Sequence, residues 1–216
     1  MIKENAPVIP TKRRIIAEAL TLFSERGYEA VTVADIAKAV GVKAPALYKH
    51  FKSKLDIFNA IFIDMKNSYD RQTSSMNLDG TDAAKDRDIY LNADIDGIVR
   101  MSVNLFLYFI HDENVRKFRK MLAIEMYGNK QLAAVYNERF VDFPLSYQSA
   151  VFGQMIGAGV ANAENTRVMA LQYYAPVFLY ITLCDCQPER EAEAVAALER
   201  HFRQFIRIYG KKIGEF

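Results

Sequence analysis

The chain has 216 residues, of which 51% are hydrophobic and 25% charged, with a formal net charge of +2. These values allow a substantial buried core in two domains of ordinary size, and they exclude a uniformly acidic or basic chain. The most apolar run, residues 175–184, is about half of the ~20 residues that span a bilayer, and the polar, proline-broken start has no signal-peptide pattern. We therefore expect a cytoplasmic protein without a membrane segment.

The first predicted helix covers residues 11–26 and ends at Gly27. Its apolar side chains recur at the spacing of one helix face, at Ile16, Ala19, Leu20 and Phe23. We expect this face to pack against the two short helices that follow.

Residues 32–51 read as two short helices joined by a tight glycine turn. Thr32 and Asp35 have the spacing of a capping box at the start of the first helix, and Gly41 suits the left-handed residue that follows its end. Pro45 suits the first turn of the second helix, which we expect to run to about His50. This pattern is typical of a helix-turn-helix, whose second helix enters the major groove of double-stranded DNA.

A further helix is predicted to leave this unit. Ser53 and Asp56 have capping-box spacing, and apolar residues continue to about residue 73. Residues 74–85 are polar and contain glycine, which predicts a loop.

Several of these segments resemble the TetR family of transcriptional repressors. The resemblance rests on residues 19–28 (ALTLFSERGY), 32–37 (TVADIA), Gly41-Val42 and 47–54 (LYKHFKSK), and it covers about residues 11–58. It implies a DNA-binding domain over residues 1–58 and a helical effector-binding and dimerisation domain over residues 59–216.

The family pattern also implies which residues contact DNA. The backbone would be held by Thr32, Tyr48, His50 and Lys54, and the residues nearest base edges would be Lys43, Ala44, Pro45 and Lys49. Lys43 departs from the Ser or Thr that is common in the family, so the usual hydroxyl cap of the reading helix is absent. Ala44 and Pro45 offer no side-chain donor, which limits them to apolar contact with bases.

The charge is distributed in agreement with this assignment. Residues 1–58 hold ten Lys and Arg against six Asp and Glu, whereas the remainder holds eighteen against twenty. A solvated helix face explains a basic cluster equally well when charge is considered alone, but together with the helix-turn-helix the excess favours contact with phosphates.

Apolar periodicity predicts an all-α second domain. The expected helices are 88–110, 114–127, 130–157 with a kink or break at Pro144, 165–184 and 189–209. In the TetR family the last two helices pair with those of a second copy as a four-helix bundle, which implies a homodimer here; the alternative is that they only close the monomer core. A dimer would bind a palindromic operator, because two heads read two half-sites.

Aromatic and methionine side chains in the second domain suggest a pocket for an unidentified small-molecule effector. The candidates are Met101, Asn104, Tyr108, Met121, Glu125, Tyr147, Phe152, Met155, Tyr174 and Phe178. For each of them, ordinary core packing is the alternative. Glu125 fits either a buried counter-charge for a cationic ligand or the exposed edge of an amphipathic helix, and we favour the exposed edge.

The chain shows no pattern typical of an enzyme. It lacks a glycine-rich phosphate loop and a Ser-His-Asp set, and neither its three His nor its two Cys have metal-ligand spacing. We expect no catalysis, no metal and no cofactor. The resemblance instead implies a dimeric repressor released from its operator by a small molecule; the alternative is a DNA-binding dimer without an effector.

Overall fold

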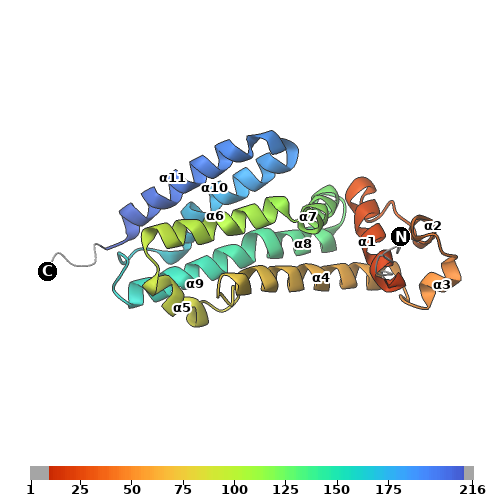
Figure 1. Cartoon of the computed structure of the whole chain (residues 1–216), viewed down its shortest axis with the longest axis horizontal. Helices are drawn as coiled ribbons and strands as arrows, with labels where there is room; N and C mark the ends of the chain where they lie inside the picture. The colour runs from red at the N-terminus through yellow and green to blue at the C-terminus, as the bar shows by residue number, and fades with distance from the viewer. Residues whose placement is uncertain (1–9, 212–216) are drawn as a thin grey trace, which may run out of the picture. The chain divides into compact units, whose positions relative to one another are not determined.

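The computed structural model describes residues 10–211, and its elements within that range are helical (Figure 1). In chain order they are α1 (Thr11–Arg26), α2 (Val33–Val40), α3 (Ala44–Tyr48), α4 (Lys54–Ser75), α5 (Ala83–Asn92), α6 (Ile95–His111), α7 (Glu113–Glu125), α8 (Lys130–Asn137), the π-helical turn η1 (Glu138–Asp142), α9 (Phe143–Gly157), α10 (Thr166–Cys186), the 3-10 turn η2 (Pro188–Arg190) and α11 (Glu191–Tyr209). The only β-type pairing in this range is an isolated bridge between Ala161 and Gly210. The all-α expectation is confirmed.

The chain divides into two compact units. Within the described residues, the head unit contains 10–67 together with 117–133, and the helical unit contains 68–116 and 134–211. This division differs from the expected boundary at residue 58, because α4 continues unbroken through it and because part of α7 packs in the head. The ring of Phe118, for example, lies 6.2 Å from that of Phe58.

The head unit has its own core. α1 buries Ile15, Ala19, Leu20 and Phe23, so its inward face begins at Ile15 rather than at the expected Ile16. Aromatic rings extend this core along the unit, with centroid separations of 5.1 Å from Phe23 to Tyr28 and 5.6 Å from Tyr28 to Phe58.

Glu125 lies inside the head unit, and its expected exposed position is wrong. The side chain is 7% exposed, and its Oε1 accepts the backbone N–H of Glu29 at 3.1 Å. Gly27 passes close beside it with φ +83°, where a Cβ atom would stand 2.6 Å from that same Oε1. Glu125 therefore closes the turn after α1, a role that depends on residues almost a hundred positions away and that helix periodicity could not reveal.

One expected helix, 88–110, is in fact two. α5 starts earlier, where the Asp82 carboxylate accepts the Ala84 N–H at 3.0 Å, and it ends at Asn92. Asp94 then caps α6 by accepting the Gly97 N–H at 2.6 Å. Asp94 is a local N-cap signal, and the apolar periodicity on both sides of it concealed the break.

The expected break near Pro144 is confirmed, and it takes the form of the π-helical turn η1. Pro144 has no N–H to donate, which leaves the carbonyl of Phe140, four residues earlier, without its usual helical partner. The Tyr174 hydroxyl donates to this oxygen at 2.9 Å. A side chain of α10 thus satisfies the backbone group that the proline releases.

The helical unit is built on contacts of α6, α10 and α11, the last two running side by side in Figure 1. Their shared core includes Val103, Phe106, Ile181, Leu198 and Phe202. Among the described residues, α10 is the one helix long and apolar enough to cross a membrane by length and composition, which qualifies the expectation that no segment approaches a span. The same properties suit a helix with one buried and one exposed apolar face.

Candidate nucleic-acid interface and ligand cavity

The turn between α2 and α3 is formed by local signals. Thr32 Oγ1 accepts the Asp35 N–H at 3.1 Å, and Asp35 Oδ2 accepts the Thr32 N–H at 2.9 Å, which completes the predicted capping box. At the other end Gly41 has φ 76° and ψ 32°, and the Val42 N–H donates to the Ala37 carbonyl at 2.9 Å. These bonds form a Schellman motif, which sets the direction in which the chain enters α3.

The second helix of the motif, α3, is only five residues long. Its N-cap residue Lys43 makes no side-chain cap, as the absence of a hydroxyl predicted. Leu47 is fully buried and holds α3 to the head core. The exposed residues at this end of the head are Lys43, Pro45, Tyr48, Lys49 and His50, and Ala44 is half-buried. The structure therefore brings six of the eight residues predicted to contact DNA together on and beside α3.

The other two, Thr32 and Lys54, already have partners within the head. The Thr32 hydroxyl donates to Asp35 Oδ2 at 2.7 Å, and these Thr32 hydrogen bonds lower the pKa of the Asp35 carboxyl. Lys54 Nζ donates to the carbonyl oxygen of Tyr28 at 2.9 Å and lies 4.2 Å from the centre of the Tyr28 ring. Contact of either residue with phosphate competes with these interactions.

The helical unit contains a cavity of about 90 Å³ whose walls come from α4, α5, α6, η1, α9, α10 and α11. Eight of its seventeen lining residues are Phe or Tyr. Burial raises the pKa of two of these tyrosines, Tyr69 and Tyr173, to about 12. Their hydroxyls are therefore neutral hydrogen-bonding groups at physiological pH.

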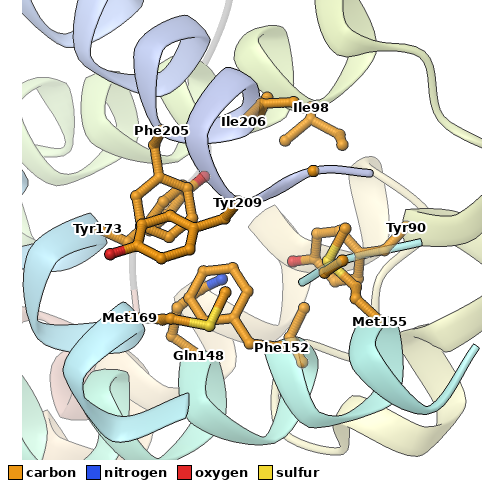
Figure 2. Close-up of a pocket in the computed structure, with 13 residues that line it drawn as sticks. Tyr90, Ile98, Gln148, Phe152, Met155, Met169, Tyr173, Phe205, Ile206 and Tyr209 are labelled. Atoms are coloured by element: carbon orange, nitrogen blue, oxygen red, sulfur yellow. The ribbon is translucent and has the colours of Figure 1, made fainter. Parts of the chain in front are cut away.

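A second, smaller cavity of about 40 Å³ shares Tyr90, Gln148 and Tyr173 with the first. Figure 2 shows the rings of Phe152, Tyr173 and Phe205 directed toward one another beside it. Their centroids lie 5.1–5.6 Å apart, and the residues belong to a buried cluster. This second space is a gap in a packed aromatic core.

Arg139, in the π-helical turn η1, is the one formally charged residue that lines the larger cavity. Its guanidinium carbon lies 4.8 Å from the centre of the Tyr69 ring and 5.8 Å from that of Phe143. No ion pair joins Arg139 to a carboxylate anywhere in residues 10–211. Two aromatic rings thus hold this cation in place while its charge stays uncompensated.

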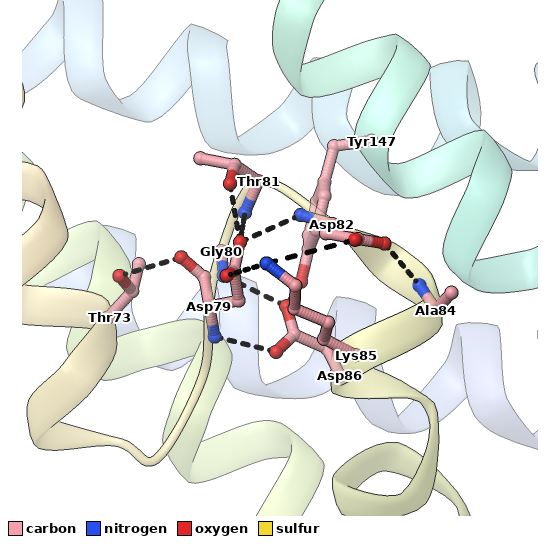
Figure 3. Close-up of polar contacts among 9 residues, drawn as sticks. All are labelled: Thr73, Asp79, Gly80, Thr81, Asp82, Ala84, Lys85, Asp86 and Tyr147. Carbon is pink, nitrogen blue, oxygen red and sulfur yellow. Dashed lines mark hydrogen bonds and ion pairs between the residues drawn. The ribbon is translucent and has the colours of Figure 1, made fainter.

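A buried carboxylate connects the wall of the cavity to the loop between α4 and α5 (Figure 3). Asp86 is 1% exposed and accepts the N–H groups of Asp79 at 2.6 Å and Gly80 at 2.8 Å. It also accepts the hydroxyl of the cavity residue Tyr147 at 2.5 Å. Burial and the neighbouring Tyr90 and Asp86 raise the pKa of Tyr147, so its hydroxyl keeps the proton that it donates.

The same loop is bound to the end of α4. The Tyr69 hydroxyl, which belongs to the cavity wall, donates to the Gly80 carbonyl at 3.0 Å, and Thr73 Oγ1 donates to the Asp79 carbonyl at 3.2 Å. Together with Asp86 and Tyr147, these residues form a polar clamp between α4, α5 and α9.

The head unit matches known proteins by sequence. Residues 15–61 match the family model of bacterial regulatory proteins of the tetR family. A 47-residue segment is 53% identical to the biofilm operon icaADBC negative transcriptional regulator IcaR of Staphylococcus aureus, covering 22% of this chain and 25% of that protein. The match thus spans about a quarter of the curated relative's length.

Solved structures share the fold of almost the whole chain. A TetR-family regulator of Mesorhizobium loti, described as a putative one, is 18% identical with a TM-score of 0.69, over 93% of this chain and 97% of that one. The SmeT repressor of Stenotrophomonas maltophilia, in complex with triclosan, is also 18% identical with a TM-score of 0.69, over 94% and 93%. The head match and the common fold agree.

Residues 15–61 therefore match the DNA-binding domain of the tetR family.

The structure separates the predicted effector residues into several groups. Met101, Tyr147 and Tyr174 line the larger cavity, and Phe152 and Met155 line the smaller one. The rest lie elsewhere: Asn104 is exposed on α6 beside a separate surface hollow, Tyr108 and Phe178 pack against the neighbouring rings of Phe109 and Tyr174, and Met121 and Glu125 belong to the head unit.

Sequence reasoning missed the most distinctive residues of the cavity. The sequence places Tyr69 at the far end of the exit helix, where that helix is expected to meet the second domain, but it does not single out Tyr69, Tyr90 or Arg139 as pocket residues. Arg139 reaches the cavity from a π-helical turn that no sequence pattern predicted. The proline five residues later was the available signal, because a helix that must bypass a missing N–H often changes its pitch locally.

Proposed function

We propose that this protein is a cytoplasmic transcriptional repressor of the TetR family that binds a palindromic operator as a homodimer and releases it when a small molecule enters the helical unit. The observation that carries the proposal is the helix-turn-helix, whose short α3 presents exposed basic and aromatic side chains. IcaR is a negative regulator and SmeT is a repressor, and their similarity to this chain favours repression. A DNA-binding dimer without an effector is the alternative.

On DNA, we assign the direct contacts to the exposed end of the head. Tyr48, His50 and Lys54 would hold phosphates, with Thr32 beside them, and Lys43 and Lys49 would reach base edges in the major groove. Ala44 and Pro45 would allow close approach and apolar contact with a thymine methyl group. Because α3 offers few directional donors, DNA shape would contribute to operator choice.

Support for a homodimer comes from the exposed face of α10. Val168, Leu171, Ala175, Leu179 and Thr182 are all exposed and recur at intervals of three and four residues, so they form one stripe. Val177 and Ile181 are buried on the opposite face. A helix with a second, uncovered apolar face is suited to pairing with a second copy, and α11 adds the exposed Ile208.

The cavity in the helical unit is the proposed effector site. Its wall includes Tyr69, and Tyr69 belongs to α4, the helix whose first residues lie in the head. A ligand that binds better to the conformation unable to bind DNA would lower operator affinity by the same free energy by which DNA lowers ligand affinity. Such a coupling is typically ~1–3 kcal/mol.

The test is operator selection from random DNA followed by a binding assay with Tyr48→Ala. Tyr48 is 52% exposed, so its loss should weaken operator binding at least about ten-fold while the thermal midpoint stays within a few degrees of the parent. Tyr127→Ala is the matched control, because Tyr127 is 94% exposed in the same head unit but distant in sequence from α3. A selected site without two-fold symmetry, or equal effects of both substitutions, would contradict the proposal.

A further inference from the structure

The composition of the larger cavity restricts the chemistry of a molecule that fits it. Aromatic side chains from six helices surround the space, among them Tyr69, Tyr90, Phe109 and Tyr174. Such walls favour a flat, apolar or aromatic molecule, because ring stacking adds to the free energy of burying apolar surface.

One positively charged side chain is part of this largely apolar wall. Arg139 is the only charged lining residue, and no carboxylate within residues 10–211 forms an ion pair with it. The carboxylate that is hydrogen-bonded to the wall residue Tyr147, that of Asp86, is also bound by two backbone N–H groups. A partly buried cation without a counter-charge gains most from an anionic ligand group, and a planar guanidinium can hold a carboxylate through two parallel hydrogen bonds.

The structure points to a small aromatic carboxylate as the ligand of this cavity, with Arg139 binding its carboxylate and the tyrosine and phenylalanine rings enclosing its ring. The inference rests on the proposed effector site and names its ligand class.

The position of Arg139 also argues against a cationic ligand. Aromatic cages bind quaternary ammonium groups through the faces of their rings. Here the Arg139 guanidinium already lies 4.8 Å from the centre of the Tyr69 ring and 5.8 Å from that of Phe143. It therefore takes the place that a ligand cation would have over these rings, and its charge repels a second cation. The tyrosine hydroxyls do not offset this repulsion, because burial raises the pKa of Tyr69, Tyr90 and Tyr173 and keeps them neutral.

The size of the cavity adds a requirement for movement. Its volume is about 90 Å³, whereas a cavity of ~150 Å³ holds benzene. A ring with a carboxylate therefore enters only if flexible wall residues such as Met76 and Met101 change rotamer. The ligand would bind an opened form of the unit, which is the condition for shifting its conformational equilibrium.

The experiment compares three probes of similar shape and different charge by isothermal titration calorimetry with the full-length protein. They are 3-phenylpropionate, its neutral amide and 3-phenylpropyl-trimethylammonium. The acid should bind at least about ten-fold more tightly than either of the others. Arg139→Met should remove this preference, Arg139→Lys should keep part of it, and Arg87→Met, an exposed arginine of α5 outside the cavity lining, should leave it unchanged.

Several results would overturn the ligand class: equal or tighter binding of the amide or the ammonium compound, no binding of any probe at millimolar concentration, or an acid preference that survives Arg139→Met. Circular-dichroism melts of each variant accompany the titrations, and the three probes on the parent protein decide the question if Arg139→Met does not fold. A gel-shift assay on the selected operator separates the two proposals. If the acid binds through Arg139 but does not release DNA, the ligand class stands and effector gating is wrong.

Discussion

Lys54 stabilises the head unit, and we also assign it to contact with DNA. Its ammonium group binds the carbonyl oxygens of Tyr28 at 2.9 Å and Glu29 at 3.4 Å, and it lies over the Tyr28 ring. These carbonyls follow the end of α1, so Lys54 joins α4 to the segment that leads into α2. A DNA phosphate would have to share the Lys54 ammonium group with these carbonyl oxygens or replace them. Lys49 is exposed, so a phosphate meets no such competing acceptor there.

Lys54→Ala should therefore destabilise the protein, whereas Lys49→Ala should not. The loss of a charge-assisted hydrogen bond and a cation–π contact in a half-exposed position should lower the unfolding free energy by about 1 kcal/mol. Thermal melts of the two variants provide the measurement. Equal midpoints would show that the Lys54 contacts contribute nothing to stability, and a salt dependence of operator binding shallower by about one unit would add a phosphate contact to its role.

Among the helices, α4, α5 and α9 are joined by the polar clamp around Asp86. Its carboxylate is buried, so it depends on the three donors that face it, from Asp79, Gly80 and Tyr147. Tyr147 is also part of the cavity wall. Any ligand that displaces the Tyr147 ring must therefore either stretch this hydrogen bond or move the loop that ends α4. The clamp is therefore a second link between the cavity and α4, in addition to Tyr69, which lines the cavity itself.

Tyr147→Phe should test this link. Removing the hydroxyl leaves the buried Asp86 with one donor fewer, which should lower the unfolding free energy by about 1–2 kcal/mol. It should also reduce the ability of a bound ligand to release the operator, while operator affinity without ligand changes less than about three-fold. Tyr127→Phe, an exposed tyrosine of the head, is the control. Ligand release that is identical in both variants would exclude the clamp from the coupling.

The proposed pairing of two chains would use a surface that the single chain leaves uncovered. α10 has apolar residues on both faces, and only 28% of its most apolar window is buried. Val168, Leu171 and Leu179 are each about half exposed or more, at 49%, 54% and 62%. Leaving such a stripe in water is unfavourable, so pairing of two α10 helices would contribute to the stability of each chain.

Leu179→Glu should convert the dimer into a monomer, because it places a charge in the middle of the exposed α10 stripe. Light scattering after size-exclusion chromatography should then give the mass of one chain, 24.6 kDa, where the parent gives twice that mass. Ile95→Glu is the matched control, since Ile95 is 51% exposed on α6. A parent protein of 24.6 kDa, or a Leu179→Glu variant that stays dimeric, would disprove pairing through this stripe.

The features that sequence reasoning found have their causes close together in the chain. The capping box of Thr32 and Asp35, the left-handed Gly41 and the break at Pro144 all involve hydrogen bonds that form, or fail to form, within about five residues. The start of α6 at Asp94 is equally local and was missed because the apolar pattern ran across it. Such features follow from short-range chemistry, and they are sufficient to identify the head.

The features that were missed or misjudged involve distant parts of the chain. Glu125 closes a turn at Gly27 and Glu29, and Arg139 meets Tyr69 across seventy residues. Whether Met121 faces a ligand or the head core depends on how α7 divides between the two units. Helical periodicity states which residues share a face, but it does not state which distant face they meet. The class of fold and the DNA-binding motif therefore follow from the order of residues, whereas the cavity, its single cation and the clamp beside it exist only because packing brings residues 69, 86, 139 and 147 together.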